Sequence, residues 1–176
     1  MKDNKMVKYP LILGLVALFA GLLLALVYNI TSPIIEENKI KRENEVIIEM
    51  FGDDVKIEDI STTLKDAEKS AGITSALKTI DSGKTYYVYK VTFADEFDGD
   101  ESSYVMAVDS NGKVYKFKFT LSADDWAGKY DKTAYINSII GKASLNDNDI
   151  ISGASGTGKA LIKSVNAAIA HKGRVD

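Results

Sequence analysis

An unbroken apolar segment near the N-terminus, from Leu11 to Val27, constrains the fold of this 176-residue chain more than any other feature. Its seventeen residues carry no charged or strongly polar side chain, and Tyr9 and Tyr28 flank it. A helix rises ~1.5 Å per residue, so this segment and its flanks can cross a hydrocarbon core of roughly 30 Å. Tyrosines at both ends suit the interfaces of a bilayer. We therefore predict one transmembrane helix over residues 9–30.

Three lysines, Lys2, Lys5 and Lys8, precede the apolar segment. Positive charge beside a membrane helix favours the cytoplasmic side. We therefore predict a single-pass protein of the cell membrane, with a cytoplasmic N-terminus over residues 1–8 and an extracytoplasmic body. A cleaved signal peptide is the alternative, but its apolar core would be shorter, ~7–15 residues, with small residues before the cut. Residues 25–28, Ala-Leu-Val-Tyr, are a poor cleavage site, which favours a retained anchor in the lipid bilayer.

The residue types that the chain lacks argue against several classes of chemistry. It has no cysteine, which excludes disulfides, thiolate zinc sites and cysteine-ligated iron–sulfur clusters. Its one histidine, His171, lies near the C-terminus, where we expect it to be exposed, so histidine triads and multi-histidine metal sites are not expected. Redox or transfer chemistry would therefore come from a bound cofactor. A net charge of −3 makes the chain a poor binder of polyanions, so no nucleic-acid partner is predicted.

The rest of the chain alternates helical and strand patterns. Ser32-Pro33 fits an N-cap followed by proline in the first turn, so we expect a separate juxtamembrane helix over residues 31–50. Residues 51–176 would form the extracytoplasmic domain, which carries both period-two alternation and apolar helical stripes. These patterns predict strands over residues 76–80, 85–93, 104–108 and 114–120, and helices over 61–71, 133–140 and 157–170. The order predicts an α+β fold with a mostly antiparallel sheet flanked by helices.

The most informative motif lies close to the C-terminus and spans nine residues. It reads Asp149-Ile150-Ile151-Ser152-Gly153-Ala154-Ser155-Gly156-Thr157. The last residue offers a hydroxyl at the predicted start of a helix, where free N–H groups and about half a positive charge favour an anion. Gly153, Ala154 and Gly156 are small enough for close approach to the backbone, and Lys159 would add positive charge. The pattern therefore favours an anion beside the Thr157 hydroxyl, which we expect to be exposed.

This motif resembles the flavin-attachment signature Asp-x-x-Ser/Thr-Gly-Ala-Ser/Thr-x-Ser/Thr. In proteins with that signature the last hydroxyl carries FMN through a phosphoester bond, which implies covalent FMN on Thr157. The resemblance also implies cofactor contacts from the neighbouring residues Asp149, Ser152, Gly153, Ala154, Ser155, Gly156 and Lys159. Asp149 either helps the attaching enzyme to recognise the site or caps the turn locally. We assign no catalytic or metal-ligating residue.

The whole layout, with one N-terminal span and a signature before a final amphipathic helix, resembles RnfG, the FMN-binding subunit of Rnf-type electron-transport complexes. It is also similar to the related FMN-binding subunit of the sodium-translocating NADH:quinone reductase. The resemblance implies a non-autonomous electron carrier within an ion-translocating oxidoreductase complex. It further implies two kinds of partner: other membrane subunits and, during maturation, a magnesium-dependent flavin transferase that uses FAD.

One segment departs from this family. Relatives often carry a Glu-Thr-Pro-Gly-like loop that approaches the flavin after the central strands. Residues 121–126 of this chain read Leu-Ser-Ala-Asp-Asp-Trp instead, with neither proline nor glycine. The pattern therefore assigns no residue to the flavin ring. Trp126 and Tyr130 are either ring-stacking side chains or ordinary core aromatics.

Three other interpretations compete with a flavoprotein that works inside a complex. A stand-alone extracytoplasmic flavoprotein would carry the same cofactor. A loop that merely caps a helix, with Ser155 or Thr157 as N-cap, would belong to a membrane-tethered interaction domain. Residues 153–159 also fit the Gly-x-x-x-x-Gly-Lys pattern of a P-loop nucleotide hydrolase. That hydrolase is disfavoured, because Ala160 replaces the magnesium-binding hydroxyl and only sixteen residues follow it.

Overall fold

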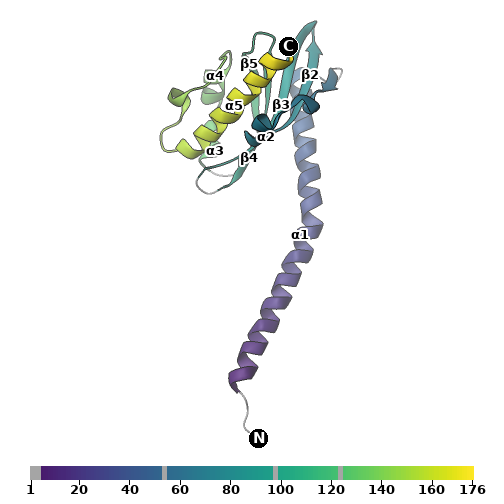
Figure 1. Ribbon diagram of the computed structural model, residues 1–176, viewed down its shortest axis with the longest axis vertical. Helices are drawn as coiled ribbons and strands as arrows, with labels where there is room; N and C mark the ends of the chain where they lie inside the picture. Colours follow the sequence, from purple (N-terminus) through teal and green to yellow (C-terminus); the bar gives the residue numbers. More distant parts are fainter. Residues whose placement is uncertain (1–4, 53–54, 97–98, 123–124) are drawn as a thin grey trace. The chain divides into compact units, whose positions relative to one another are not determined.

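The computed structural model describes residues 5–52, 55–96, 99–122 and 125–176 (Figure 1). Of the residues that carry the predictions, Lys2, the side chain of Lys5, Ala123 and Asp124 lie outside this part of the chain. Contacts within the chain form two units, Met1–Lys41 and Arg42–Asp176. One helix contributes to both units, and the second unit contains the sheet and the remaining helices.

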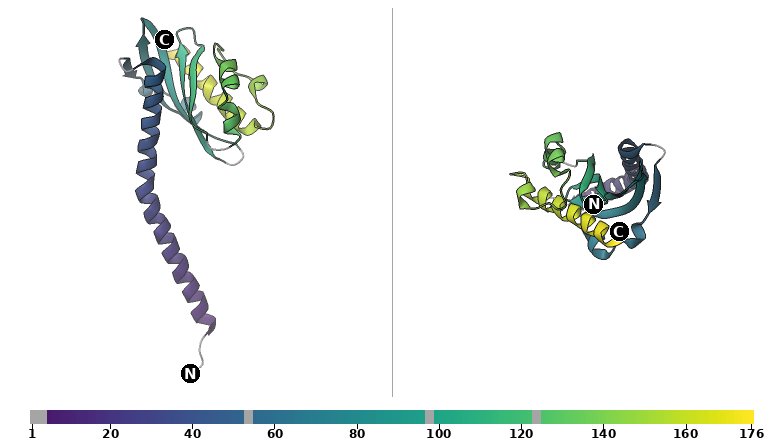
Figure 2. Two further views of the ribbon diagram at one scale, coloured as in Figure 1. Left: turned by 180° about the vertical axis from the view of Figure 1, so that it is seen from behind. Right: turned by 90° about the horizontal axis from the view of Figure 1, so that it is seen from above.

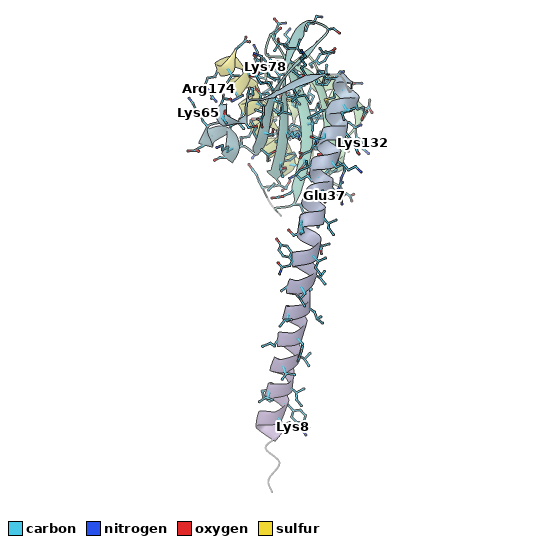
Figure 3. The ribbon with its side chains drawn as sticks, turned by 90° about the vertical axis from the view of Figure 1, so that its right-hand side faces the viewer. Lys8, Glu37, Lys65, Lys78, Lys132 and Arg174 are labelled. Atoms are coloured by element: carbon cyan, nitrogen blue, oxygen red, sulfur yellow. The ribbon has the colours of Figure 1, made fainter. Side chains whose placement is uncertain are left out.

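Helix α1 runs from Lys5 to Phe51. Along the segment Leu11–Val27 its side chains are exposed, and among the described residues it is the one helix long and apolar enough to cross a membrane. Figure 3 shows Lys8 and Glu37 on this helix, at the two ends of the stretch that contains the apolar segment. These properties are those of an N-terminal membrane anchor.

The structure has one helix where two are expected on either side of Ser32-Pro33. Proline inside a helix removes one backbone hydrogen bond and crowds the preceding turn, at a cost of about 3 kcal/mol. Pro33 nevertheless lies inside α1, and the Thr31 hydroxyl donates to the carbonyl of Val27 in the turn before it. The helical residues on both sides outweigh this single defect, so α1 continues to Phe51, one residue beyond the expected end.

Five antiparallel strands form one sheet in the order β1-β2-β3-β4-β5, so each strand pairs with its neighbour in sequence. The strands are β1 (Lys56–Asp59), β2 (Ile73–Asp81), β3 (Lys84–Ala94), β4 (Glu101–Asp109) and β5 (Val114–Leu121). Ser82 and Gly83, both at positive φ, form the two-residue turn between β2 and β3. The predicted strands are confirmed with longer bounds. The additional strand β1 is short and fully exposed at the edge of the sheet, so it carries no apolar alternation.

Shorter helical segments occupy the connections. Between β1 and β2 the chain forms η1 (Ser61–Thr63) and α2 (Asp66–Ser70), so the helix expected over residues 61–71 is divided in two. After β5 come α3 (Ala127–Tyr130), α4 (Thr133–Ile139) and η2 (Asp147–Asp149). The final helix α5 spans Ser155–Val175, which is longer at both ends than the expected 157–170.

Both faces of the sheet are covered. Helix α5 lies in front of the strands in Figure 1 and behind them in the left view of Figure 2. It buries Leu161, Val165 and Ala168 in a core with the inward residues of the strands, among them Tyr89, Val91, Tyr104 and Met106. On the opposite face, Val88, Val105 and Ala107 pack against Val46, Ile47 and Met50 from the last turns of α1. The domain is thus an α+β fold with an antiparallel sheet, as predicted.

The prediction that His171 is exposed is wrong, since its side chain is 0% exposed. Its Nδ1 lies 2.9 Å from the Tyr89 hydroxyl, and its Nε2 lies 2.8 Å from the Thr63 hydroxyl. The reason is the length of α5, which places His171 three residues after the buried Ala168 on the same face. His171 therefore joins the last helix to β3 and η1.

Candidate functional site

The first turn of α5 presents Thr157 to a loop made by the signature. The helix begins at Ser155 after Ala154, so Thr157 is its third residue and does not open it as predicted. Gly153 has φ of 78°, a left-handed conformation that favours glycine and turns the chain into the helix. Neither Ser155 nor Thr157 is the N-cap, which contradicts the interpretation of the loop as a simple helix cap. The first N–H groups of such a helix have no partner within the helix.

Tyr130 holds this loop in place. Its hydroxyl donates to the carbonyl oxygen of Ala154 at 2.9 Å and accepts from the backbone N–H of Ile151 at 3.0 Å. Burial raises the pKa of Tyr130, so the phenol keeps the proton that it donates. A Cβ added to Gly158 would lie 2.2 Å from the same hydroxyl oxygen. The glycine that completes the P-loop-like pattern is therefore required by packing against Tyr130.

Thr157 lines a cavity of about 310 Å³. The lining comes from the end of β3, the segment after β5 and the signature, namely Asp95, Trp126, Gly153, Ala154, Ser155, Gly156 and Thr157. The Thr157 side chain is not exposed as expected, because the residue is only 2% exposed and its hydroxyl donates to the Asp95 carboxylate. The signature thus brings its small residues and its hydroxyl to one cavity, and the fold adds an aromatic ring and a carboxylate.

Trp126 and Lys129 form a paired group beside the signature loop. Trp126 is 45% exposed and lines the cavity, whereas Tyr130 is fully buried and braces the loop. The Lys129 ammonium lies 4.0 Å from the centroid of the Trp126 ring. A Cβ at Gly153 would be 3.6 Å from Lys129 Nζ and 3.8 Å from the Trp126 ring. Sequence reasoning missed Lys129, although its i, i+3 spacing from Trp126 in a helical turn was a usable signal.

Asp149 caps a local turn and does not line the cavity. Its carboxylate accepts from the backbone N–H of Asn146 at 2.9 Å and pairs with Lys142. Burial opposes its ionisation, but the hydrogen bonds from Lys142 and from the Asn146 amide hold the pKa of Asp149 below its usual range. The local capping role considered for Asp149 is therefore present in the structure.

Two further predicted contact residues do not line the cavity. Ser152 and Lys159 are both exposed, and neither is among the described residues that line it. Among the described residues, the positive charge within 4 Å of a Cβ placed at Gly153 is that of Lys129 and not that of Lys159.

Comparison with known proteins bears on the N-terminal part of the chain. Residues 1–49 match the family model described as the RnfG N-terminal region, which covers the apolar segment and nearly all of α1 but not the signature. No curated protein matches the chain. The match covers the N-terminal span and leaves the signature untested. Residues 1–49 of this chain are therefore similar to the N-terminal region of RnfG, a subunit of Rnf complexes.

Proposed function

We propose that this chain is a membrane-anchored electron-transfer flavoprotein that carries FMN on the Thr157 hydroxyl through a phosphoester bond. The observation that carries the proposal is the placement of Thr157 in the first turn of α5, inside a cavity shared with small signature residues and Trp126. As a subunit of an Rnf complex it would exchange electrons with neighbouring subunits and would not turn over a substrate alone.

The first turn of α5 suits the phosphate end of FMN. A phosphate on Thr157 would lie at the N-terminus of a helix, where unpaired N–H groups and the helix dipole stabilise negative charge. Gly153, Ala154 and Gly156 leave the backbone accessible because they carry little or no side chain. The carboxylate of Asp95 opposes a second anion at this position.

The cavity also suits part of a flavin ring. About 310 Å³ is near the lower end of small-molecule sites, so it would enclose a portion of the cofactor and leave the remainder accessible for electron exchange. Trp126 offers an exposed aromatic surface for stacking, and Lys129 holds positive charge beside it. Bound FMN would supply the redox chemistry, while these residues would orient the ring.

The anchor places the carrier beside its partners. We infer that the N-terminus is cytoplasmic and the domain of residues 51–176 extracytoplasmic, because positive charge precedes the apolar segment. The match of residues 1–49 to the RnfG N-terminal region favours a subunit of an Rnf complex over a stand-alone flavoprotein. The P-loop alternative loses its support, since Gly158 is explained by Tyr130 and Lys159 is exposed.

Covalent attachment is tested by producing the full chain together with a flavin transferase and separating it on a denaturing gel. The parent is expected to show ultraviolet-excited flavin fluorescence and the intact mass of the chain plus FMN. Thr157→Ala removes the acceptor oxygen and should abolish both signals. Ser144→Ala, which removes an exposed hydroxyl outside the signature and the cavity, should keep them. A fluorescent band in Thr157→Ala would move the attachment site elsewhere, and an unlabelled parent with a transferase active on another acceptor would refute the proposal.

A further inference from the structure

The contact between Asp95 and Thr157 is a short polar link across the cavity. Thr157 Oγ1 donates to Asp95 Oδ2 at 2.5 Å, although the two residues lie 62 positions apart in the sequence. A carboxylate oxygen is a strong acceptor for a hydroxyl donor, because a charge-assisted hydrogen bond is stronger than a neutral one. The donor is the very oxygen on which the proposed attachment depends, and Thr157 is only 2% exposed.

Backbone hydrogen bonds fix the position of Asp95. It directly follows the last residue of β3, and its N–H donates to the carbonyl of Asp100 at 3.0 Å. The N–H of Gly99 donates in turn to the carbonyl of Asp95 at 3.2 Å. The side chain therefore extends from the end of a central strand, and its approach to α5 is a property of the fold.

We propose that Asp95 accepts the proton of the Thr157 hydroxyl when the phosphoester forms, an inference that rests on the proposed function. The co-reactant is a flavin dinucleotide. Thr157 Oγ1 forms a bond to the phosphorus that carries riboflavin, and the bond from this phosphorus to the bridging oxygen breaks. The nucleoside monophosphate leaves with the bridging oxygen and its electron pair, while the hydroxyl proton passes to Asp95 Oδ2. Nothing is oxidised or reduced.

Two physical arguments favour this role. A threonine hydroxyl is a weak nucleophile unless a neighbouring base removes its proton, and the Asp95 carboxylate already holds that proton in a hydrogen bond. An ionised Asp95 would then face a negative phosphodiester, which is unfavourable because like charges oppose one another. The transferred proton neutralises the carboxyl group at the moment when the phosphodiester arrives.

The test measures the rate of flavin incorporation into the detergent-solubilised full chain, with flavin transferase, FAD and Mg²⁺. Asp95→Asn keeps the shape of the side chain and can accept a hydrogen bond, but it cannot take up the proton. Its rate is expected to fall by about 100-fold or more, the usual effect of losing a general base. Glu96→Gln removes an equal charge at the next, exposed position and should label at the parental rate.

A second variant separates proton acceptance from a structural role. Asp95→Ala should label as slowly as Asp95→Asn and regain rate with added formate but not with equal chloride, because formate can replace the carboxylate. The fluorescence of Trp126, the single tryptophan, reports whether each variant is folded. If Asp95→Asn does not fold, the formate response of Asp95→Ala alone shows whether residue 95 acts as the proton acceptor.

Three results would overturn the role of Asp95: labelling of Asp95→Asn within threefold of the parent, faster labelling of that variant, or a slow Asp95→Ala without rescue by formate. Each leaves flavin on Thr157 of the parent, so the proposed function survives. An unlabelled parent beside a labelled control acceptor refutes the proposed function itself.

Discussion

At the scale of single residues, Gly158 and Tyr130 determine the shape of the signature loop. A methyl group at position 158 would lie 2.2 Å from the Tyr130 hydroxyl and 3.1 Å from the Ile150 side chain. We expect Gly158→Ala to displace Tyr130 from its hydrogen bonds to Ile151 and Ala154, and overpacking of this kind costs about 1–3 kcal/mol. Urea unfolding of the full chain in detergent, followed by Trp126 fluorescence, measures the loss of stability.

A matched glycine provides the control for this experiment. Gly128 lies in α3 and has open space where a Cβ would be placed. Gly128→Ala should therefore leave stability unchanged or raise it slightly. Equal stability of Gly158→Ala and the parent would show that Tyr130 does not brace the loop.

At the scale of elements, α5 is joined to its neighbours by His171, whose ring lies between Tyr89 of β3 and Thr63 of η1. Burial, followed by the positive charge of Arg174, lowers the pKa of His171, while Glu68 opposes this shift. The folded state therefore binds the histidine proton more weakly than the unfolded state does, where the pKa is about 6.5. The contribution of neutral His171 to the stability of the folded state is therefore complete above about pH 6.5 and is lost as the pH falls below this value.

Urea midpoints of the parent and of His171→Gln, measured from pH 8 to pH 5, test this coupling. The parent should lose stability more steeply below about pH 6.5, because glutamine does not titrate. Carboxyl groups titrate alike in both chains, and His171 is the only histidine, so the difference between the two slopes reports this side chain. Equal pH dependence of the urea midpoints in the two chains would contradict a lowered pKa of His171 in the folded state.

At the scale of the whole molecule, the absence of cysteine permits a direct test of membrane topology. Asn4→Cys places one thiol before the apolar segment, and Lys132→Cys places one on an exposed residue of the sheet domain. In right-side-out membrane vesicles, a membrane-impermeant maleimide should label Lys132→Cys at once and Asn4→Cys only after detergent is added. The parent, without a thiol, gives the background, and the reverse labelling pattern would invert the proposed orientation.

The sequence predicted much of the fold because the relevant signals are local. Seventeen apolar residues, period-two alternation in β3 and β5 and the i, i+3, i+4 stripe of α5 each depend on neighbours a few positions away. The predicted break at Pro33 was wrong because the cost of one proline competes with the helical preference of the residues on both sides. Strand β1 was missed because its four exposed residues are too few to show a pattern. His171 was missed because α5 continues one turn beyond its expected end.

By itself the sequence determined the anchor, the antiparallel α+β domain and the motif that ends in Thr157, since each is written in a continuous run of residues. Only the tertiary structure decided what surrounds that threonine. It brought Asp95 across from the end of β3, separated the exposed Trp126 from the buried Tyr130 and placed Lys129 beside the loop. Contacts between residues tens of positions apart depend on how strands and helices pack, and no local pattern in the chain records that packing.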